Sequence, residues 1–151
     1  MFDEIGLFDE VHFAYLEDVD LCYRARIYGY RNLYIPDAVV RHVGSATSGS
    51  VYNEFKVRYA SRNSIYLIYK NMPFLQILLN LPFLAAGFLI KFLFFAAKGY
   101  GIVYIRGLKK GIGLCERSRK VRVQSRHIPH YLRIQWELWA NTIRRAVDWQ
   151  R

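Results

Sequence analysis

Cysteine is scarce in this chain: only Cys22 and Cys115 occur among its 151 residues. No Cys-x-x-Cys pair and no cluster of cysteine with histidine is present, which argues against a zinc site and against a scaffold held by several disulfides. Cys22 falls inside a helical pattern, where a free cysteine usually packs as a small buried hydrophobic residue. The first ten residues, MFDEIGLFDE, are acidic and lack a basic n-region, so they are unlike a secretory signal.

Acidic residues are scarce after residue 50. Residues 1–50 contain eight acidic and four basic residues, whereas residues 51–151 contain four acidic and eighteen basic ones, so the two zones carry net charges of −4 and +14. A basic zone favours phosphate-rich partners, either nucleic acid or anionic lipid. The composition is 53% hydrophobic, which is too apolar for a disordered chain and fits one domain or a piece of a larger protein.

A long apolar run, MPFLQILLNLPFLAAGFLIKFLFFAA, occupies residues 72–97. It exceeds the roughly 20 apolar residues that a membrane-spanning helix needs, but it is interrupted by Gln76, Asn80, Pro82 and Lys91. Basic residues lie on both sides of the run, whereas a single crossing usually leaves one flank poor in lysine and arginine. We therefore expect residues 72–111 to form membrane-associated helices, broken near Asn80–Pro82 and dipping into one leaflet. A true span and a buried helix of a soluble core are the alternatives.

The remaining residues, 112–151, are predicted to form a basic helical tail. The block RGLKKGIGLCERSRKVRVQSR, at residues 106–126, is typical either of a solvated face or of a surface that meets anionic headgroups, where each base contributes about 1 kcal/mol. Its position after the apolar run favours lipid, and the long apolar run argues against nucleic acid as a partner. Leu132, Trp136, Trp139 and Ile143 predict an amphipathic helix. Their stripe packs in a core or a dimer, or it lies at a membrane interface.

Residues 1–71 alternate between strand-like and helical patterns. Short strands are predicted where aromatic and β-branched residues gather, at residues 12–16, 32–35 and 38–43. Between the first two of these, residues 18–28 have apolar residues at helical spacing, begin with acidic residues and stop at Gly29. A second helix is predicted over residues 52–71. This order predicts an α/β fold at the front of the chain, with a short mixed sheet and the first helix packed on it.

Three carboxylates crowd the start of the first predicted helix: Glu17, Asp18 and Asp20, in the stretch YLEDVDL. Three roles fit these residues. They can cap the helix and interact with the positive end of its dipole. They can bind a hard cation, which prefers clustered carboxylates. One of them, held at a strand-to-helix junction, can accept a proton from a substrate hydroxyl. The spacing alone does not separate these roles.

The wider arrangement of motifs resembles a known enzyme family. The stretch GLFDEVHFAYLEDVDLCYRARIYGYRNLYIPDAVVRH, residues 6–42, closely resembles the C-terminal half of the catalytic domain in glycosyltransferase family 2. With RNSIYLIYKN, residues 62–71, the resemblance covers roughly residues 1–71, and it is greatest to rhamnosyltransferase-like members. It implies a GT-A-type nucleotide-diphospho-sugar transferase fold. It also implies transfer of a sugar, with inversion, from a nucleotide-diphospho-sugar to an acceptor hydroxyl.

The resemblance also implies roles for single residues. Asp18 would be the general base that deprotonates the acceptor hydroxyl as it attacks the anomeric carbon. Glu17 would assist this catalysis and Asp20 would bind the acceptor. His42, in VVRHVGSAT, is similar to a family histidine that helps to hold the divalent metal at the diphosphate; taken alone, it is more typical of a surface histidine at a strand end. Arg62 would contact phosphates of donor or acceptor, and a solvated helix arginine is the alternative.

The nucleotide-binding half of that family, with its Asp-x-Asp metal motif, has no counterpart before Glu17. We therefore expect this chain to be a fragment whose nucleotide-sugar donor and divalent metal, Mg²⁺ or Mn²⁺, are mostly held by a missing N-terminal half. The implied acceptor is polyprenyl-linked or a glycan, as in cell-surface polysaccharide synthesis. The expected location is the cytoplasmic face of the cell membrane, against an anionic surface. A non-catalytic membrane-binding remnant of such an enzyme is the alternative function.

Overall fold

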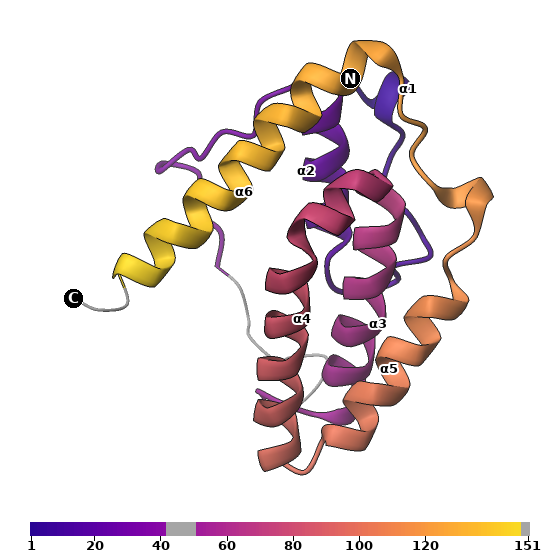
Figure 1. Cartoon of the computed structure of the whole chain (residues 1–151), viewed down its shortest axis with the longest axis vertical. Coiled ribbons are helices and arrows are strands. Elements are labelled where there is room, and N and C mark those ends of the chain that lie inside the picture. The colour runs from indigo at the N-terminus through magenta and orange to yellow at the C-terminus, as the bar shows by residue number, and fades with distance from the viewer. Residues whose placement is uncertain (42–50, 149–151) are drawn as a thin grey trace.

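The computed structural model describes residues 1–41 and 51–148, and within these ranges the chain forms helices, turns and irregular segments without a β-strand. The helices, shown in Figure 1, are α1 (Phe2–Ile5), α2 (Glu17–Ile27), α3 (Glu54–Asn71), α4 (Phe74–Ala97), α5 (Gly101–Gly113), η1 (Arg117–Arg119), η2 (Ser125–His127) and α6 (Ile128–Asp148). The predicted α/β fold is therefore wrong for the described chain, and so is the GT-A-type architecture that the resemblance implied.

The segments that were expected to be strands have no strand partner among the described residues. Residues 12–16 form turns that lead into α2, and residues 31–41 are irregular and exposed. Leu33 and Val40 in the second segment are 76% and 85% exposed, so they do not pack on the helices. Two short strands are marginally stable in water unless a third strand or a helix covers them. High β propensity without such a surface does not produce a sheet.

Helix α2 confirms the helix predicted at residues 18–28 to within one residue at each end. Its first turn holds the three acidic side chains and its last turn holds Arg24 and Arg26, which suits the helix dipole at both ends. The N-cap residue is Leu16, so none of the carboxylates caps the helix. Gly29 follows the helix with a φ of 88°, a left-handed conformation that commonly ends helices.

Helices α3 and α5 touch backbone to backbone at two buried glycines of α5. A Cβ atom on Gly107 would lie 2.8 Å from the carbonyl oxygen of Arg58. A Cβ atom on Gly111 would lie 2.9 Å from Cβ of Ile65 and would overlap the carbonyl oxygen of Arg62. The two glycines are one turn apart on the same face, a spacing that lets helices approach closely. Helix α3 is thereby fixed against α5 along much of its length.

Helix α4 is continuous through Pro82, so the predicted break near Asn80–Pro82 is wrong. Proline removes one backbone hydrogen bond and often kinks a helix, but here it does not end it. The 24 residues of α4 correspond to a length of ~36 Å at 1.5 Å per residue. By length and composition, α4 is able to cross a membrane. A tight turn at Gly99 follows α4, and α5 then runs antiparallel to it (Figure 1).

Two polar residues of α4 face the protein, which the sequence alone did not reveal, whereas Lys91 is exposed. Gln76 and Asn80 are buried, and they bond to Tyr23 on α2 and to Gln135 on α6. The rest of the helix surface, here called the outer face of α4, exposes Phe74, Leu75, Leu78, Leu79, Leu81, Phe83, Leu89, Ile90, Leu93 and Phe94. Thus the polar interruptions at Gln76 and Asn80 leave the outer face almost wholly apolar.

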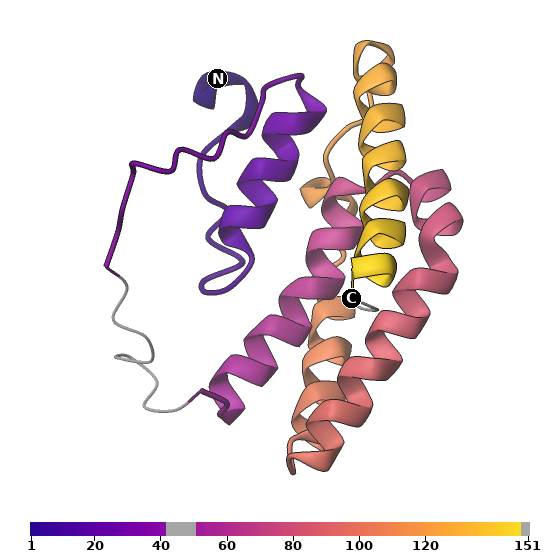
Figure 2. The same cartoon turned by 90° about the vertical axis from the view of Figure 1, so that its left-hand side faces the viewer.

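Helix α6 packs against α2 and α4. A small core forms where Ile27 of α2 meets Tyr131 and Ile134 of α6. Figure 2 shows α1 and α2 on one side of α3, and α4 on the other side. The three segments that the sequence separates, residues 1–71, 72–111 and 112–151, therefore contact one another through the pairs α3–α5 and α2–α6.

Candidate active site at the start of helix α2

The chain enters α2 through a strained turn. Phe13, Tyr15 and Leu16 have positive φ angles of 59°, 69° and 68°. For residues other than glycine this left-handed conformation costs of order 1–3 kcal/mol each, and it persists only where surrounding contacts hold it. Strain of this kind is concentrated at functional sites, so the turn marks the start of α2 as a candidate site.

Two side chains of α3 hold this turn in place. The Nδ2 group of the buried Asn63 donates hydrogen bonds of 2.7–2.9 Å to three carbonyl oxygens of the turn, those of His12, Ala14 and Tyr15. Arg62 Nη2 donates to the carbonyl oxygens of Val11 and His12, at 2.7 and 2.8 Å. These bonds satisfy backbone groups that the turn withdraws from water, and they stabilise its strained conformation.

Arg62 therefore has a different neighbourhood from the one that the resemblance implied. Its guanidinium carbon lies 4.5 Å from the ring centre of Tyr59, and its Nε donates to Asn63 Oδ1 at 2.9 Å. Burial lowers the pKa of Arg62, although an arginine remains charged at neutral pH. In the structure Arg62 positions the turn before α2. Its contact with an acceptor or a phosphate stays a prediction.

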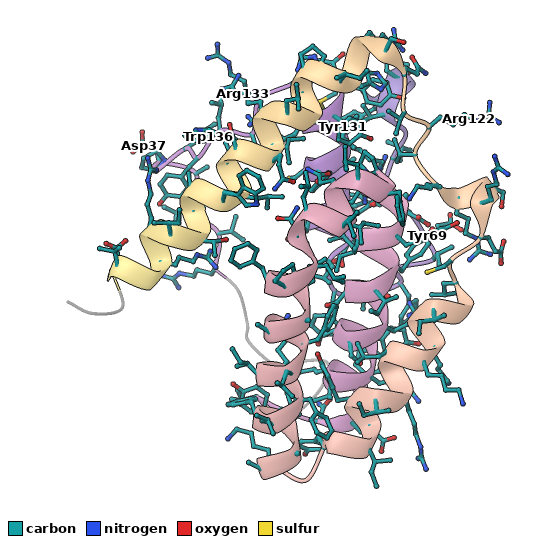
Figure 3. The ribbon with its side chains drawn as sticks, in the orientation of Figure 1. Asp37, Tyr69, Arg122, Tyr131, Arg133 and Trp136 are labelled. Carbon is teal, nitrogen blue, oxygen red and sulfur yellow. The ribbon has the colours of Figure 1, made fainter. Side chains whose placement is uncertain are left out.

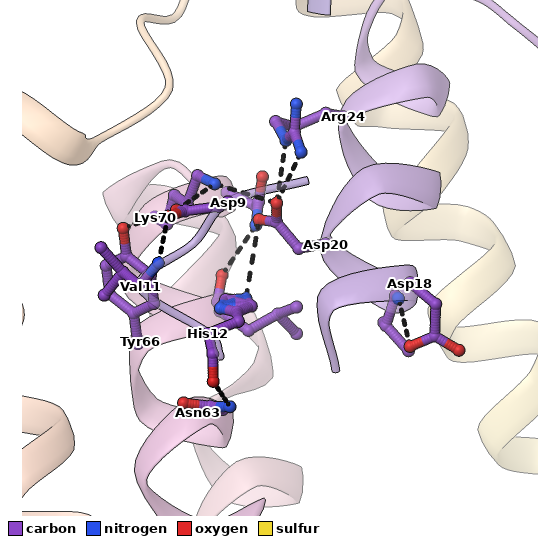
Figure 4. Close-up of polar contacts among 12 residues, drawn as sticks. Asp9, Val11, His12, Asp18, Asp20, Arg24, Asn63, Tyr66 and Lys70 are labelled. Carbon is purple, nitrogen blue, oxygen red and sulfur yellow. Dashed lines mark hydrogen bonds and ion pairs between the residues drawn. The ribbon is translucent and has the colours of Figure 1, made fainter. Parts of the chain in front are cut away.

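Asp20 lies at the centre of a buried polar network that joins α2 to α3 (Figure 4). Its Oδ2 accepts hydrogen bonds from Arg24 Nε and Lys70 Nζ, both at 2.9 Å. Its Oδ1 accepts one from Asn71 Nδ2 at 2.8 Å. A buried carboxylate needs partners of this kind to offset its lost hydration. The network occupies the side chain that was predicted to bind the acceptor, and it holds α2 on α3.

Lys70 extends the same network to the segment before α2. Its Nζ donates to Asp9 Oδ2 at 2.6 Å, and Tyr66 Oη donates to that oxygen at 2.8 Å. Burial raises the pKa of Asp9, but the hydrogen bonds from Lys70, Tyr66 and the backbone of Val11 together have the larger effect and lower the pKa to about 2. Asp9 is therefore ionised at neutral pH and pairs with Lys70.

His12 borders the network and is fully buried. Its Nε2 lies 3.9 Å from Asp20 Oδ1, and its ring packs edge-on against Tyr66 with 5.1 Å between ring centres. Burial lowers the pKa of His12 below its ordinary value of 6.5, although the charges of Asp20 and Asp9 oppose this. His12 is therefore neutral at pH 7.

Asp18 lies on the other side of α2 and faces away from the network (Figure 4). Its side chain is exposed, and its Oδ1 accepts a 2.8 Å hydrogen bond from the backbone N–H of Val19. Among the described residues no cation pairs with Asp18, so its carboxylate has lone pairs available for a ligand. The neighbouring Glu17 is half-buried, and its Oε2 has no hydrogen-bond partner in the described part of the chain.

A shallow groove of about 260 Å³ lies between α2 and α6, and its lining includes Val19, the residue after Asp18. Asp18 precedes Cys22 by four residues and Arg26 by eight, so the three share one face of α2. Cys22, predicted to be buried, is exposed here. The polar lining consists of Cys22, Tyr23, Arg26, Asn32, Glu137 and Asn141. Val19, Ile134 and Leu138 supply apolar lining as well. The groove is smaller than the roughly 300–1,000 Å³ that drug-sized ligands occupy, so it is suited to a small group.

The described residues do not fit a divalent metal site. No group of three or more His, Cys, Asp or Glu side chains is placed to hold a metal within residues 1–41 and 51–148. Asp20 already pairs with two cations, and Asp18 points to the opposite side of α2, so the two do not chelate one ion (Figure 4). His42, the predicted metal ligand, lies outside the described residues, and its role stays a prediction.

Sequence reasoning missed the residues that position the site. Asn63, Tyr66 and Lys70 lie at spacings of three and four on α3, so they share the face that contacts the start of α2. Polar side chains on the inward face of a helix are the signal that would have identified them. Asp9 occurs in the second of two Phe-Asp-Glu triplets, a repeat that gives no hint of its pairing with Lys70.

Comparisons of the chain with models of known protein families, with curated proteins and with solved structures find no match.

Proposed function

We propose that this chain is the acceptor-side part of a membrane-associated, inverting glycosyltransferase in which Asp18 is the general base. The observation that supports this most directly is the position of Asp18. It is an exposed carboxylate without a cationic partner among the described residues, and it follows the strained turn that Asn63 and Arg62 hold in place. The next residue, Val19, lines a groove that also contains Arg26 and Asn32. The proposal draws on the motif resemblance and on this geometry, and it does not draw on the fold.

In the proposed reaction Asp18 takes the proton from an acceptor hydroxyl. The hydroxyl oxygen forms a bond to the anomeric carbon of the donor sugar as the bond from that carbon to the nucleotide diphosphate breaks. The bonding electron pair leaves with the diphosphate, and attack from the opposite side inverts the anomeric configuration. The rigid placement of Asp18 matters, because a base must lie within hydrogen-bond reach of the proton it removes.

Neighbouring groups have supporting roles in this proposal. Glu17 stands next to the base and helps to orient it or the acceptor. Arg26 and Asn32 in the groove offer hydrogen-bond donors for sugar hydroxyls. Asp20, Asn63 and Arg62 keep α2 and its entry turn in position. The nucleotide-sugar donor and its divalent metal are assigned to protein outside the described residues.

The proposal places the chain on the cytoplasmic face of the cell membrane. The outer face of α4 supplies apolar contact area, and the basic residues of α5 and of the segment after it attract anionic headgroups. A polyprenyl-linked acceptor is anchored in the same bilayer. A catalytic base held close to the membrane therefore reaches the acceptor sugar while the lipid stays in place.

The experiment measures transfer of radiolabelled sugar from a panel of nucleotide-diphospho-sugars into the lipid extract of membranes from the native cells, in which the chain acts together with the protein that holds the donor. Asp18→Asn should lower incorporation by at least about 100-fold, the lower end of what a general base contributes. Asp3→Asn is the matched control, because Asp3 is also an exposed acid in the first turn of a helix. Both variants should bind membranes as the wild type does. Full incorporation with Asp18→Asn, or none above membranes without the chain, contradicts the proposal.

A second candidate function is a membrane-binding module without catalysis. The specific observation in its favour is the large exposed outer face of α4, which needs no active site to bind lipid. Flotation with anionic vesicles and the transfer assay in native membranes separate the two functions. Binding to vesicles, together with sugar transfer that persists when the chain is removed from native membranes, would favour the module.

A further inference from the structure

Helix α6 has one face that packs against the protein. Tyr131, Ile134 and Gln135 are buried, and Leu138 packs against the same core. Gln135 exchanges hydrogen bonds with Asn80 of α4, at 2.7 and 3.1 Å. This inner face fixes α6 on α2 and α4. Beyond this face, Glu137 pairs with Arg26 of α2.

A second face of α6 is apolar and exposed. It consists of Leu132, Trp136, Ile143 and Val147, which are 67%, 70%, 65% and 50% exposed, and is here called the α6 stripe. The intervals of four, seven and four residues place these side chains in one row along the helix. Figure 3 shows Trp136 on the part of α6 that extends away from the other helices, whereas Tyr131 lies toward them. A large exposed apolar row of this kind marks an interaction surface.

Basic residues accompany the α6 stripe. Arg133, Arg144 and Arg145 are exposed on the helix, and Arg126 is exposed just before it. The acidic Glu137 is already paired with Arg26 and Arg133. Asp148 at the end of α6 is exposed as well, but the arginines outnumber it. The exposed surface of α6 is therefore net basic, and its complement is an anionic partner.

The α6 stripe borders the outer face of α4. Leu132 and Trp139 lie three residues before and four residues after Gln135, so they neighbour it on the helix surface. Gln135 is the residue that contacts Asn80, and Phe83, one turn further along α4, is exposed. Figure 1 shows α6 leaving the bundle from the end of α4 where the two helices meet. The apolar surface of α4 therefore continues onto α6.

We propose that α6 is an interfacial helix that lies in the plane of an anionic lipid leaflet. The α6 stripe enters the boundary between headgroups and acyl chains, and Trp136 lies at headgroup depth. Arg133 and Arg144 bind lipid phosphates beside it. A second copy of α6 is the poorer partner, because the same arginines would face one another across the interface. This inference does not depend on sugar transfer.

Tryptophan fluorescence tests the proposal directly, since all three tryptophans, Trp136, Trp139 and Trp149, lie in or after α6. The variant Trp139→Phe/Trp149→Phe leaves Trp136 as the reporter in the full chain. With phosphatidylglycerol vesicles, its emission should shift to shorter wavelength and acrylamide quenching should fall. Lipids brominated near the headgroup should quench it more than lipids brominated at the chain end. Unchanged emission and acrylamide quenching would overturn the proposal, and so would a shift that follows protein concentration without vesicles.

Stripe variants in this single-tryptophan chain separate α6 from α4. Leu132→Glu/Ile143→Glu should abolish quenching of Trp136 by brominated lipid, even where α4 keeps the protein on the vesicles. Val39→Glu/Val40→Glu is the matched control, because it changes two exposed aliphatic residues by the same charge outside α6. The control should keep the quenching. Circular dichroism at 222 nm checks that each variant folds. If a variant does not fold, the quenching of Trp136 in the single-tryptophan chain with an intact stripe decides the question. Equal quenching in both double variants overturns the proposal.

The charge of the leaflet is the remaining variable. Partition onto neutral phosphatidylcholine vesicles should be at least about tenfold weaker than onto phosphatidylglycerol vesicles, since each base near an anionic surface contributes about 1 kcal/mol. Equal partition onto both kinds of vesicle would overturn the assignment of anionic headgroups as the partner.

Discussion

The ammonium nitrogen of Lys70 lies 2.9 Å from a carboxylate oxygen of Asp20, and both side chains are buried between α3 and α2. This pair explains why two acids two residues apart differ so strongly. Asp20 is committed to holding α2 in place, whereas Asp18 on the opposite side remains exposed. Lys70 also pairs with Asp9, so one cation compensates two carboxylates.

Lys70→Met should destabilise the fold by about 3–5 kcal/mol, because it leaves two carboxylates close together with one fewer cation. Urea unfolding followed by circular dichroism at 222 nm measures this. Lys110→Met is the matched control, since Lys110 is exposed on α5, and it should change stability by less than about 0.5 kcal/mol. A loss below about 1 kcal/mol for Lys70→Met would show that the ion pair contributes far less than a buried pair does.

Gly111→Ala should separate α3 from α5 and destabilise the fold by about 1–3 kcal/mol, the usual cost of overpacking a tight contact. The added methyl group meets the backbone carbonyl of Arg62, which cannot rotate away. Gly87→Ala is the control, because a Cβ atom there meets nothing within 4 Å. In the interior of α4 this change should stabilise the helix by up to about 1 kcal/mol. Equal effects of the two substitutions in thermal or urea unfolding would contradict the close α3–α5 contact.

Local signals in the sequence predicted helices better than they predicted strands. Acids in the first turn and Gly29 at the end gave α2 nearly its observed bounds, because these interactions act within one element. The strands at residues 32–35 and 38–43 depended on partners elsewhere in the chain. The described residues supply none, and Ile35, Val39 and Val40 stay exposed; residues 42–43 lie outside the described residues. A sheet is a tertiary structure, so a strand pattern alone is insufficient evidence for it.

Side-chain direction was the other information that the sequence could not supply. Glu17, Asp18 and Asp20 form one cluster in the sequence, yet the helical rotation of 100° per residue sends Asp18 and Asp20 to opposite sides of α2. Gln76 and Asn80 were interpreted as breaks in an apolar run. They turn out to bond inward, so they connect α4 to α2 and α6. The surface that packs against a helix must be known before a polar residue that breaks an apolar run can be distinguished from one that bonds to a neighbouring helix.

The buried His12 should make stability depend on pH. Its pKa is lowered in the folded state, so between the ordinary value of 6.5 and the folded value the unfolded chain binds a proton that the folded chain does not. Stability should therefore fall as pH decreases below about 6.5. His12→Phe should reduce the loss between pH 7.5 and 5, as measured by urea unfolding. Asp9 does not interfere, since its pKa of about 2 places its effect below about pH 4.

His130→Phe provides the comparison for this pH dependence, because His130 lies on α6 and is only partly buried. It should keep the wild-type decrease in stability between pH 7.5 and 5. If His12→Phe instead shows the same decrease as the wild type, the acid sensitivity arises elsewhere and His12 is not the titrating group.

The amide pair between Asn80 and Gln135 gives the sharpest test of how α6 is attached. Both side chains are buried, and each donates a hydrogen bond to the other. Asn80→Leu alone leaves the Gln135 amide buried without this partner, which costs about 1–3 kcal/mol. The double variant Asn80→Leu/Gln135→Leu removes both polar groups and should recover most of that loss. A double-mutant cycle in urea measures the coupling, which should be at least about 0.5 kcal/mol. Additive effects of the two substitutions would mean that α6 does not rely on this pair to remain against α4.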